Sequence, residues 1–140
     1  MRTVKSILIS FIIFSSFALC TSQTTEKNNE SQVTVSKIDV YYFHFTRRCL
    51  TCNAVEDESK KALETLYPKQ VKAGTITFQS INLDEEGSNE ISKKLDIAEQ
   101  ALLIVKGNTK INLTNEGFMY ARSNPEKLKA KIKAEVDKLL

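Results

Sequence analysis

The chain has 140 residues and three cysteines, and its 20 lysines and arginines only slightly outnumber its 17 aspartates and glutamates. The formal charge of +3 falls by two if Arg2 and Lys5 leave with a signal segment, and this near-neutral balance gives no reason to propose nucleic acid as a partner. The length suffices for one domain with its own core and leaves no room for a second.

Residues 1–20 have the layout of a secretory signal peptide. Two positive charges in MRTVK precede the apolar run SILISFIIFSSFAL, which is too short to span a bilayer comfortably. We therefore expect an exported protein, located in the periplasm or attached to a membrane and facing the periplasmic or extracellular side. A retained transmembrane anchor is the alternative.

Cys20 ends this apolar run, at the place where a bacterial lipoprotein signal carries its lipidated cysteine. Leu19 departs from that signal, because a small residue usually stands there. Cys20 is therefore a candidate for lipidation, which would be the chain's route to a membrane, or it lies near an ordinary cleavage point. In both cases it is not available to pair with Cys49 or Cys52.

Residues 21–32, TSQTTEKNNESQ, contain no large apolar side chain and are expected to form a polar linker. The folded domain is therefore expected over residues 33–140. It begins with a strand whose final part, Ile38 to Phe45, has apolar side chains at both parities, as in a strand that is covered on both faces.

The segment after the cysteines has the spacing of an amphipathic helix. Its apolar stripe consists of Cys52, Val55, Ser59, Ala62, Leu63 and Leu66. Pro68 is expected to end this helix, because proline lacks a backbone N–H and clashes with the preceding turn.

Two further strands and a helix follow along the chain. A strand is predicted from Gly74 to Asp84, and then a short helix in SNEISKKLDI with Ser88 or Asn89 as its N-cap. The apolar strand ALLIVK turns at residues 107–108 into KINL, which predicts a hairpin.

The chain ends in a helix for which Asn124 is the expected cap, with Pro125 in its first turn. Its apolar stripe is Leu128, Ile132, Val136 and Leu139.

This order of elements indicates an α/β fold. The first strand, helix and second strand form a βαβ unit, whose two strands are parallel and whose crossover is right-handed. The hairpin adds antiparallel strands to the same sheet. We expect a three-layer sandwich with a central mixed sheet of about four to five strands and helices on both faces.

The stretch RRCLTC, residues 47–52, places two thiols at the junction of a strand and a helix. Cys49 falls where the strand stops, and Cys52 falls in the first turn of the helix. The free backbone N–H groups and the dipole of a helix N-terminus favour a thiolate, and Arg47 and Arg48 add positive charge. We therefore expect Cys49 to be the attacking thiolate and Cys52 to resolve the mixed disulfide.

Other uses of the pair stay open at this point. A permanent disulfide is common in exported proteins, but a two-residue spacer closes a tiny loop and removes little unfolded-chain entropy. A structural zinc site needs about four ligands, and the domain offers only Cys49, Cys52 and His44, so no zinc is expected. Two thiolates could still hold copper(I), which keeps a metal-binding module as an alternative.

On these residues the chain resembles the thioredoxin-like superfamily of CxxC thiol–disulfide oxidoreductases. VYYFHFTRRCLTC is similar to the family's first core strand and active-site loop, and FQSINLDEEGSNEISKKLDI is similar to its second strand and helix. ALLIVKGNTKINL and the lysine-rich last helix match its closing elements. The resemblance implies dithiol–disulfide exchange, with Cys49 as the nucleophile and Cys52 as the resolving cysteine.

The chain departs from the family at three places. Leu50–Thr51 replaces the spacer residues that tune the redox potential, so the direction of exchange stays open. Phe43 stands where the family has a buried acid. Ala101 or Gln100 stands where the family has a cis-proline, and a trans bond is expected because a cis bond before another residue type is costly. Without the proline, the surface that would contact a substrate's backbone is changed, which favours one dedicated protein partner.

Three further side chains near the pair are candidates for a role. Arg48 would support the thiolate or bind an acidic segment of a substrate. His44 would shuttle a proton near neutral pH, or it is a packed residue at a strand end. Glu56, one turn beyond Cys52, would replace the missing acid, or it belongs to the solvated face of its helix.

We therefore predict an exported thiol–disulfide oxidoreductase that needs no cofactor and acts as a monomer on a protein thiol or disulfide. A membrane electron donor or oxidant would set the redox state of its thiols. The alternative is a non-catalytic module of the same fold, which binds copper(I) through Cys49 and Cys52 or docks a partner protein.

Overall fold

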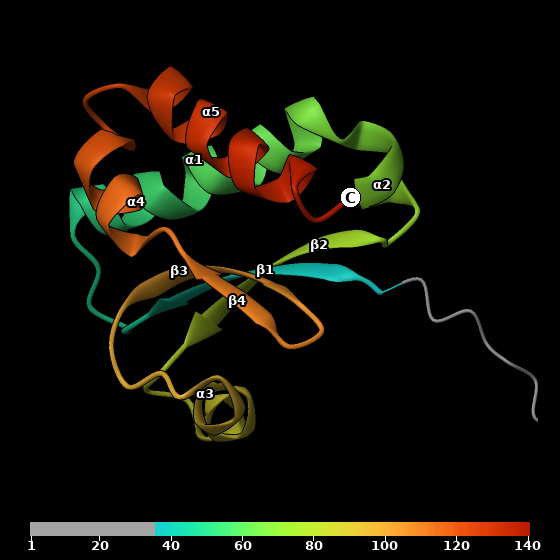
Figure 1. Cartoon of the computed structure of the whole chain (residues 1–140). Helices are drawn as coiled ribbons and strands as arrows, with labels where there is room; N and C mark the ends of the chain where they lie inside the picture. The colour runs from blue at the N-terminus through green and yellow to red at the C-terminus, as the bar shows by residue number, and fades with distance from the viewer. Residues whose placement is uncertain (1–35) are drawn as a thin grey trace, which may run out of the picture. The chain divides into compact units, whose positions relative to one another are not determined.

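The structure, a computed structural model, describes residues 36–140. The expected signal segment 1–20, Cys20 and the linker 21–32 lie outside the described residues. None of the helices in the described part of the chain is long and apolar enough to cross a membrane. The elements of Figure 1 are β1 (Ile38–His44), α1 (Leu50–Leu66), α2 (Pro68–Lys72), β2 (Ile76–Asn82), the 3-10 turn η1 (Glu86–Ser88), α3 (Asn89–Leu95), β3 (Ala101–Lys106), β4 (Thr109–Asn112), α4 (Thr114–Tyr120) and α5 (Pro125–Asp137).

The four strands form one mixed sheet in the order β2-β1-β3-β4. β1 pairs in parallel with β2, and Ile38 lies opposite Ile76, as expected for the strands of a βαβ unit. β3 runs antiparallel to β1, with Ala101 opposite Phe43, and β4 is the hairpin partner of β3. The predicted α/β class, the mixed sheet and the hairpin are thus confirmed.

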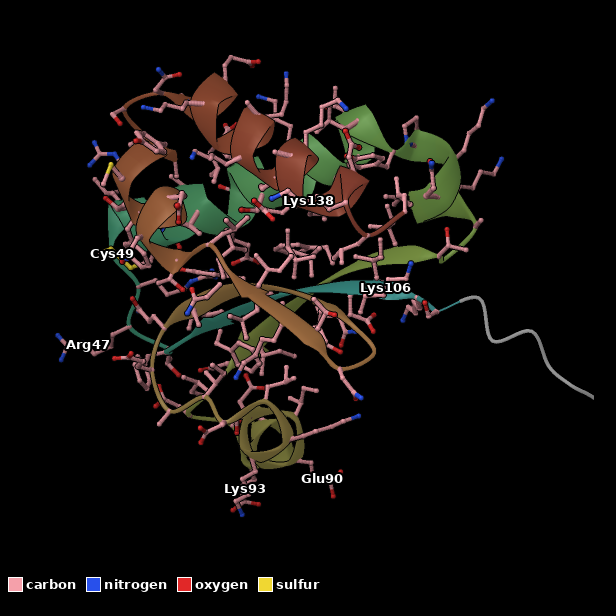
Figure 2. All side chains as sticks on the ribbon, in the orientation of Figure 1. Arg47, Cys49, Glu90, Lys93, Lys106 and Lys138 are labelled. Carbon is pink, nitrogen blue, oxygen red and sulfur yellow. A yellow bond between two sulfur atoms is a disulfide. The ribbon has the colours of Figure 1, made fainter. Side chains whose placement is uncertain are left out.

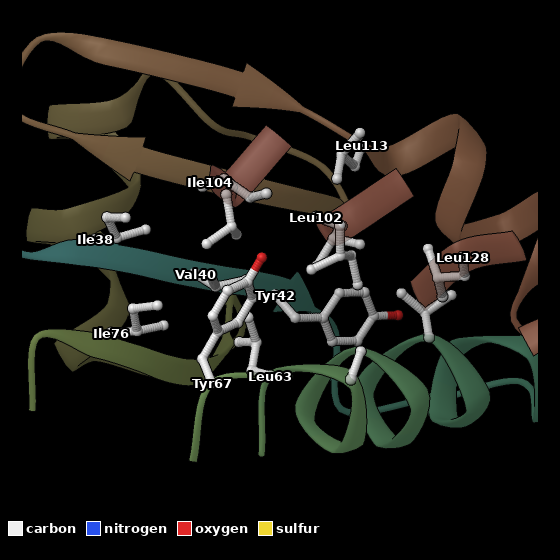
Figure 3. Close-up of a cluster of buried hydrophobic side chains, with 14 of the residues drawn as sticks. Ile38, Val40, Tyr42, Leu63, Tyr67, Ile76, Leu102, Ile104, Leu113 and Leu128 are labelled. Carbon is white, nitrogen blue, oxygen red and sulfur yellow. The ribbon is translucent and has the colours of Figure 1, made fainter. Parts of the chain in front are cut away.

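β1 lies inside the sheet, and both of its faces are buried. On one face, Val40 and Tyr42 join the larger core cluster, which includes Leu63 of α1 and Leu128 of α5 (Figure 3). On the other face, Phe43 and its neighbours pack with apolar side chains of α3. Figure 1 shows α3 beneath the sheet and α1, α2, α4 and α5 on the opposite side. This burial explains the apolar residues at both parities of the strand.

The helix after the cysteines buries the stripe that its spacing predicts. Five of the six positions are buried, namely Cys52, Val55, Ser59, Ala62 and Leu63. Pro68 follows the end of α1, as predicted, but it also begins α2, which the sequence pattern does not predict. Proline suits this first position because its missing N–H would have no partner within the helix.

The sequence pattern also does not predict α4. Gly117 lies in the middle of this helix, where glycine costs about 1 kcal/mol relative to alanine. A Cβ at this position would lie 3.1 Å from Val55 Cγ1 and 3.4 Å from Leu102 Cδ2. Gly117 therefore lets α4 approach α1 and β3 closely, and this reason for a glycine exists only in the folded chain.

The two predicted helix caps differ in their hydrogen bonds. Asn124 caps α5 as predicted, because its side-chain oxygen accepts the backbone N–H of Lys127 at 3.1 Å. Ser88 holds the N-cap position of α3, but its hydroxyl donates to the backbone carbonyls of Leu83 and Glu85. Ser88 therefore closes the preceding turn and does not cap the helix.

Candidate active site

Cys49 and Cys52 form a disulfide at the N-terminus of α1, with their Cα atoms 5.0 Å apart. Cys49 is the N-cap residue of the helix, and its Sγ accepts the backbone N–H of Cys52 at 3.1 Å. Cys49 is exposed, whereas only 3% of Cys52 is accessible to solvent. The structure thus places Cys49 at the surface and Cys52 inside the protein.

Hydrogen bonds to the end of β2 and the residues after it hold the loop between β1 and α1. The backbone N–H of Thr46 donates to Asp84 Oδ2 at 2.8 Å, and the Asn82 amide donates to Thr46 Oγ1 at 3.1 Å. The backbone N–H of Leu83 also donates to the carbonyl of His44 at 2.7 Å. The hydrogen bonds from Thr46 lower the pKa of Asp84, so the carboxylate that holds the loop persists to lower pH. The last residue of β2 and the two residues after it therefore hold the loop that leads to Cys49.

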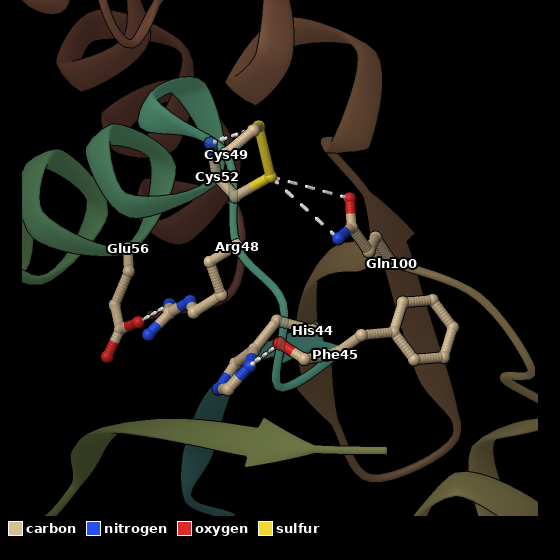
Figure 4. Close-up of polar contacts among 7 residues, drawn as sticks. All are labelled: His44, Phe45, Arg48, Cys49, Cys52, Glu56 and Gln100. Atoms are coloured by element: carbon tan, nitrogen blue, oxygen red, sulfur yellow. Dashed lines mark hydrogen bonds and ion pairs between the residues drawn. A yellow bond between two sulfur atoms is a disulfide. The ribbon is translucent and has the colours of Figure 1, made fainter. Parts of the chain in front are cut away.

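The two arginines before Cys49 point in different directions. Arg47 is exposed, and Figure 2 shows its side chain reaching away from the protein. The Arg48 guanidinium forms an ion pair with Glu56 and lies over the Tyr42 ring, 5.8 Å from its centroid. In Figure 4 this guanidinium is directed at Glu56 and not at the disulfide. Glu56 therefore offsets the positive charge that Arg48 was expected to provide for the thiolate.

The partner of Arg48 is half-buried rather than part of a freely solvated face. The side chains of Arg48 and Glu56 are 24% and 23% exposed, and Tyr42 beneath them is fully buried. Burial raises the pKa of the Tyr42 hydroxyl, so the ring under the guanidinium stays neutral around pH 7. Sequence spacing pointed to Glu56 as an acid near Cys52, but the structure pairs it with Arg48.

Gln100 and Ala101 occupy different environments, although both are candidates for the same position in the family resemblance. Ala101 is a buried residue of β3 and belongs to the core cluster around Phe43. The Gln100 amide faces the disulfide, with Oε1 and Nε2 each 3.8 Å from Cys52 Sγ. Of these two residues, therefore, Gln100 is the one whose side chain contacts the sulfur.

His44 lies at the end of β1 and is 8% exposed. Its Nδ1 is 3.0 Å from the carbonyl oxygen of Phe45, and its ring lies 5.8 Å from the ring of Tyr42. Figure 4 shows the imidazole directed away from the disulfide. His44 is therefore a packed side chain that is hydrogen-bonded to the neighbouring backbone.

A cavity of about 790 Å³ is lined in part by Gln100, the residue whose amide contacts Cys52 Sγ. Its lining comes from the loop at 96–100, from β3 and β4, and from the start of α4. Among residues 36–140, no three histidine, cysteine, aspartate or glutamate side chains gather in a way that could hold a metal ion. The sulfurs therefore contact the backbone N–H of Cys52 and the Gln100 amide, and Gln100 also lines the cavity.

We expect Glu56→Gln to make Cys49 of the reduced protein more reactive. The substitution keeps the side-chain volume but removes the charge that offsets Arg48, so the guanidinium would lower the pKa of the Cys49 thiol. Alkylation of Cys49, measured below the ordinary pKa range of cysteine, should become about twofold to fivefold faster. Glu64→Gln on an exposed turn of α1 is the matched control and should leave the rate unchanged.

No family model matches the chain, and no curated protein matches it. A solved structure described as "Structure of a malarial protein" is similar at 19% sequence identity and a TM-score of 0.38. The similarity covers 53% of this chain and 74% of that chain.

Proposed function

We propose that the chain is a thioredoxin-like thiol–disulfide oxidoreductase that exchanges disulfides with a protein partner. The observation that carries the proposal is the asymmetric pair at the start of α1, with an exposed Cys49 and a buried Cys52 in one disulfide. A nucleophile must reach a partner's sulfur, whereas a resolving thiol must reach only the nucleophile. The geometry suits both requirements.

The fold supports the thioredoxin-like assignment. A parallel β1–β2 pair with an intervening helix, an antiparallel β3–β4 hairpin and helices on both faces are consistent with that sandwich. The sequence resemblance at the strand and loop leading to Cys52 points to the same family. Phe43 and Gln100 distinguish this chain within it, since they stand at positions where the resemblance implies an acid and a proline.

Exchange proceeds in two balanced steps when the protein reduces a partner. The Cys49 thiolate attacks one sulfur of the partner's disulfide, forms a new S–S bond with it and releases the second sulfur as a thiolate. The Cys52 thiol then loses its proton to solvent and attacks Cys49 Sγ, which releases the first partner sulfur as a thiolate. Two electrons pass to the partner, and its two thiolates take up two protons. The reverse sequence oxidises a partner dithiol.

The place of action and the partners belong to the same proposal. The signal-like residues 1–20 support export, and Cys20 would supply a lipid anchor if it is modified. Outside the cytoplasm, a membrane electron donor or oxidant would return the pair to its working redox state. The protein would act as a monomer on one or a few protein substrates.

The test of this function combines a potential with a turnover assay. The Cys49–Cys52 potential is measured in a glutathione series, and reduced protein is then offered insulin as a model disulfide. A potential near roughly −270 mV favours a reductant, and one near roughly −120 mV favours an oxidant. If the protein exchanges with neither glutathione nor insulin and purifies under reducing conditions with one copper per chain, the copper(I) module replaces the enzyme.

A further inference from the structure

The side-chain amide of Gln100 lies against the buried sulfur of the disulfide. Its Oε1 and Nε2 are equally distant from Cys52 Sγ, at 3.8 Å, which is within hydrogen-bond range for sulfur. Gln100 directly precedes β3 and lies 48 positions beyond Cys52 in the sequence. Figure 4 shows the amide facing the disulfide. Because only 3% of Cys52 is exposed, water can provide little solvation to this sulfur.

The two ends of an amide suit both forms of a thiol. In the disulfide, Cys52 Sγ carries no proton and is only a weak acceptor for the Nε2–H group. After reduction, a Cys52 thiol can donate to Oε1, and a Cys52 thiolate can accept a charge-assisted hydrogen bond from Nε2–H. A buried thiolate without such a donor is costly. The amide therefore contributes more to the reduced protein than to the oxidised protein.

We propose that Gln100 is a positioning residue for Cys52, whose amide stabilises the reduced form of the pair and thereby makes the disulfide easier to reduce. The inference rests on the proposed function and deepens it, because it assigns a hydrogen-bonding side chain to the resolving thiol. Reduction by glutathione converts two glutathione thiols into one glutathione disulfide and leaves two protonated thiols on the protein. The equilibrium constant of that reaction measures the effect directly and requires no protein substrate.

Gln100→Leu tests the proposal with a side chain of similar size that has no polar atoms. We expect its equilibrium constant for reduction by glutathione to be about fivefold below that of wild type, from the loss of one hydrogen bond. For a two-electron couple this corresponds to a potential roughly 20 mV more negative. Gln70→Leu, on partly buried α2 at the other end of α1, is the matched control and should leave the constant unchanged.

Gln100→Glu separates hydrogen bonding from packing. Glutamate resembles glutamine in shape more closely than leucine does. If Gln100 acts only by packing, the equilibrium constant and the Cys52 pKa of Gln100→Glu should therefore stay nearer to the wild-type values than those of Gln100→Leu. If the amide acts on the sulfur, the carboxylate removes the Nε2–H donor and repels the Cys52 thiolate, so the pKa of Cys52 rises above its value in Gln100→Leu. The thiolate absorbance of Cys52, followed against pH in a Cys49→Ser background, measures this pKa.

Two outcomes would overturn the inference. One is a Gln100→Leu protein whose potential and Cys52 pKa equal those of wild type. The other is a Gln100→Glu protein whose Cys52 pKa lies closer to that of wild type than the Cys52 pKa of the leucine variant does. Neither outcome bears on the proposed function, which fails only if wild-type protein does not exchange disulfides with glutathione and insulin.

Discussion

Cys49→Ser is expected to lower the rate of insulin reduction by about a thousandfold or more, because a serine hydroxyl neither ionises near neutral pH nor forms an S–S bond. Cys52→Ser should behave differently. This variant keeps the exposed nucleophile but lacks the thiol that releases the partner, so a mixed disulfide between Cys49 and the partner should accumulate. Non-reducing gels and the intact mass of the adduct distinguish the two results.

The paired variants test the order of attack as well as the chemistry. Both are made in a Cys20→Ser background, so that no third thiol can attack or resolve. If Cys52→Ser abolished adduct formation while Cys49→Ser trapped the partner, the roles of the two cysteines would be reversed. The exposed and buried positions of the sulfurs argue for the stated order, since only Cys49 can meet a folded partner without local opening.

Leu63→Ala is expected to destabilise the protein by about 2–5 kcal/mol. Leu63 is 1% exposed and belongs to the core cluster between α1 and the sheet (Figure 3), so its removal leaves a cavity that the surrounding side chains fill only in part. Alanine is an excellent helix former, and the loss therefore reports packing rather than helix propensity. Denaturant unfolding of the oxidised protein provides the measurement.

Leu50→Ala is the matched control for this prediction. Leu50 belongs to the same helix but is 73% exposed, so the same substitution should change the free energy of unfolding by less than about 0.5 kcal/mol. Equal losses at Leu50 and Leu63 would contradict the view that α1 is held to the sheet through its buried stripe.

The sequence predicted the elements whose signals are local. The period of apolar residues located α1 and α5, the β-branched and aromatic runs located β1 and β3, and the pair Gly107–Asn108 located the hairpin turn between β3 and β4. These signals depend on residues a few positions apart, which is the range over which helix and strand spacing acts. The α/β class and the mixed sheet follow from the order of those elements.

The sequence pattern did not predict two helices, α2 and α4, for different reasons. In α4, Gly117 argues against a helix by its propensity, yet the close approach to Val55 and Leu102 requires it. At α2, Pro68 signals the end of one helix and gives no sign that another starts. In α4, tertiary contacts therefore outweigh the low helix propensity of glycine, whereas α2 is a short helix whose first position suits proline.

The sequence by itself determined that Cys49 and Cys52 stand where a strand gives way to a helix, because strand composition, helix spacing and the two-residue spacer are all local. Only the tertiary structure decided what surrounds the sulfurs. It directs Arg48 to Glu56 and brings Gln100 to Cys52 from 48 positions away. Such contacts depend on how the sheet and helices pack, and the free energy of that packing is spread over the whole core.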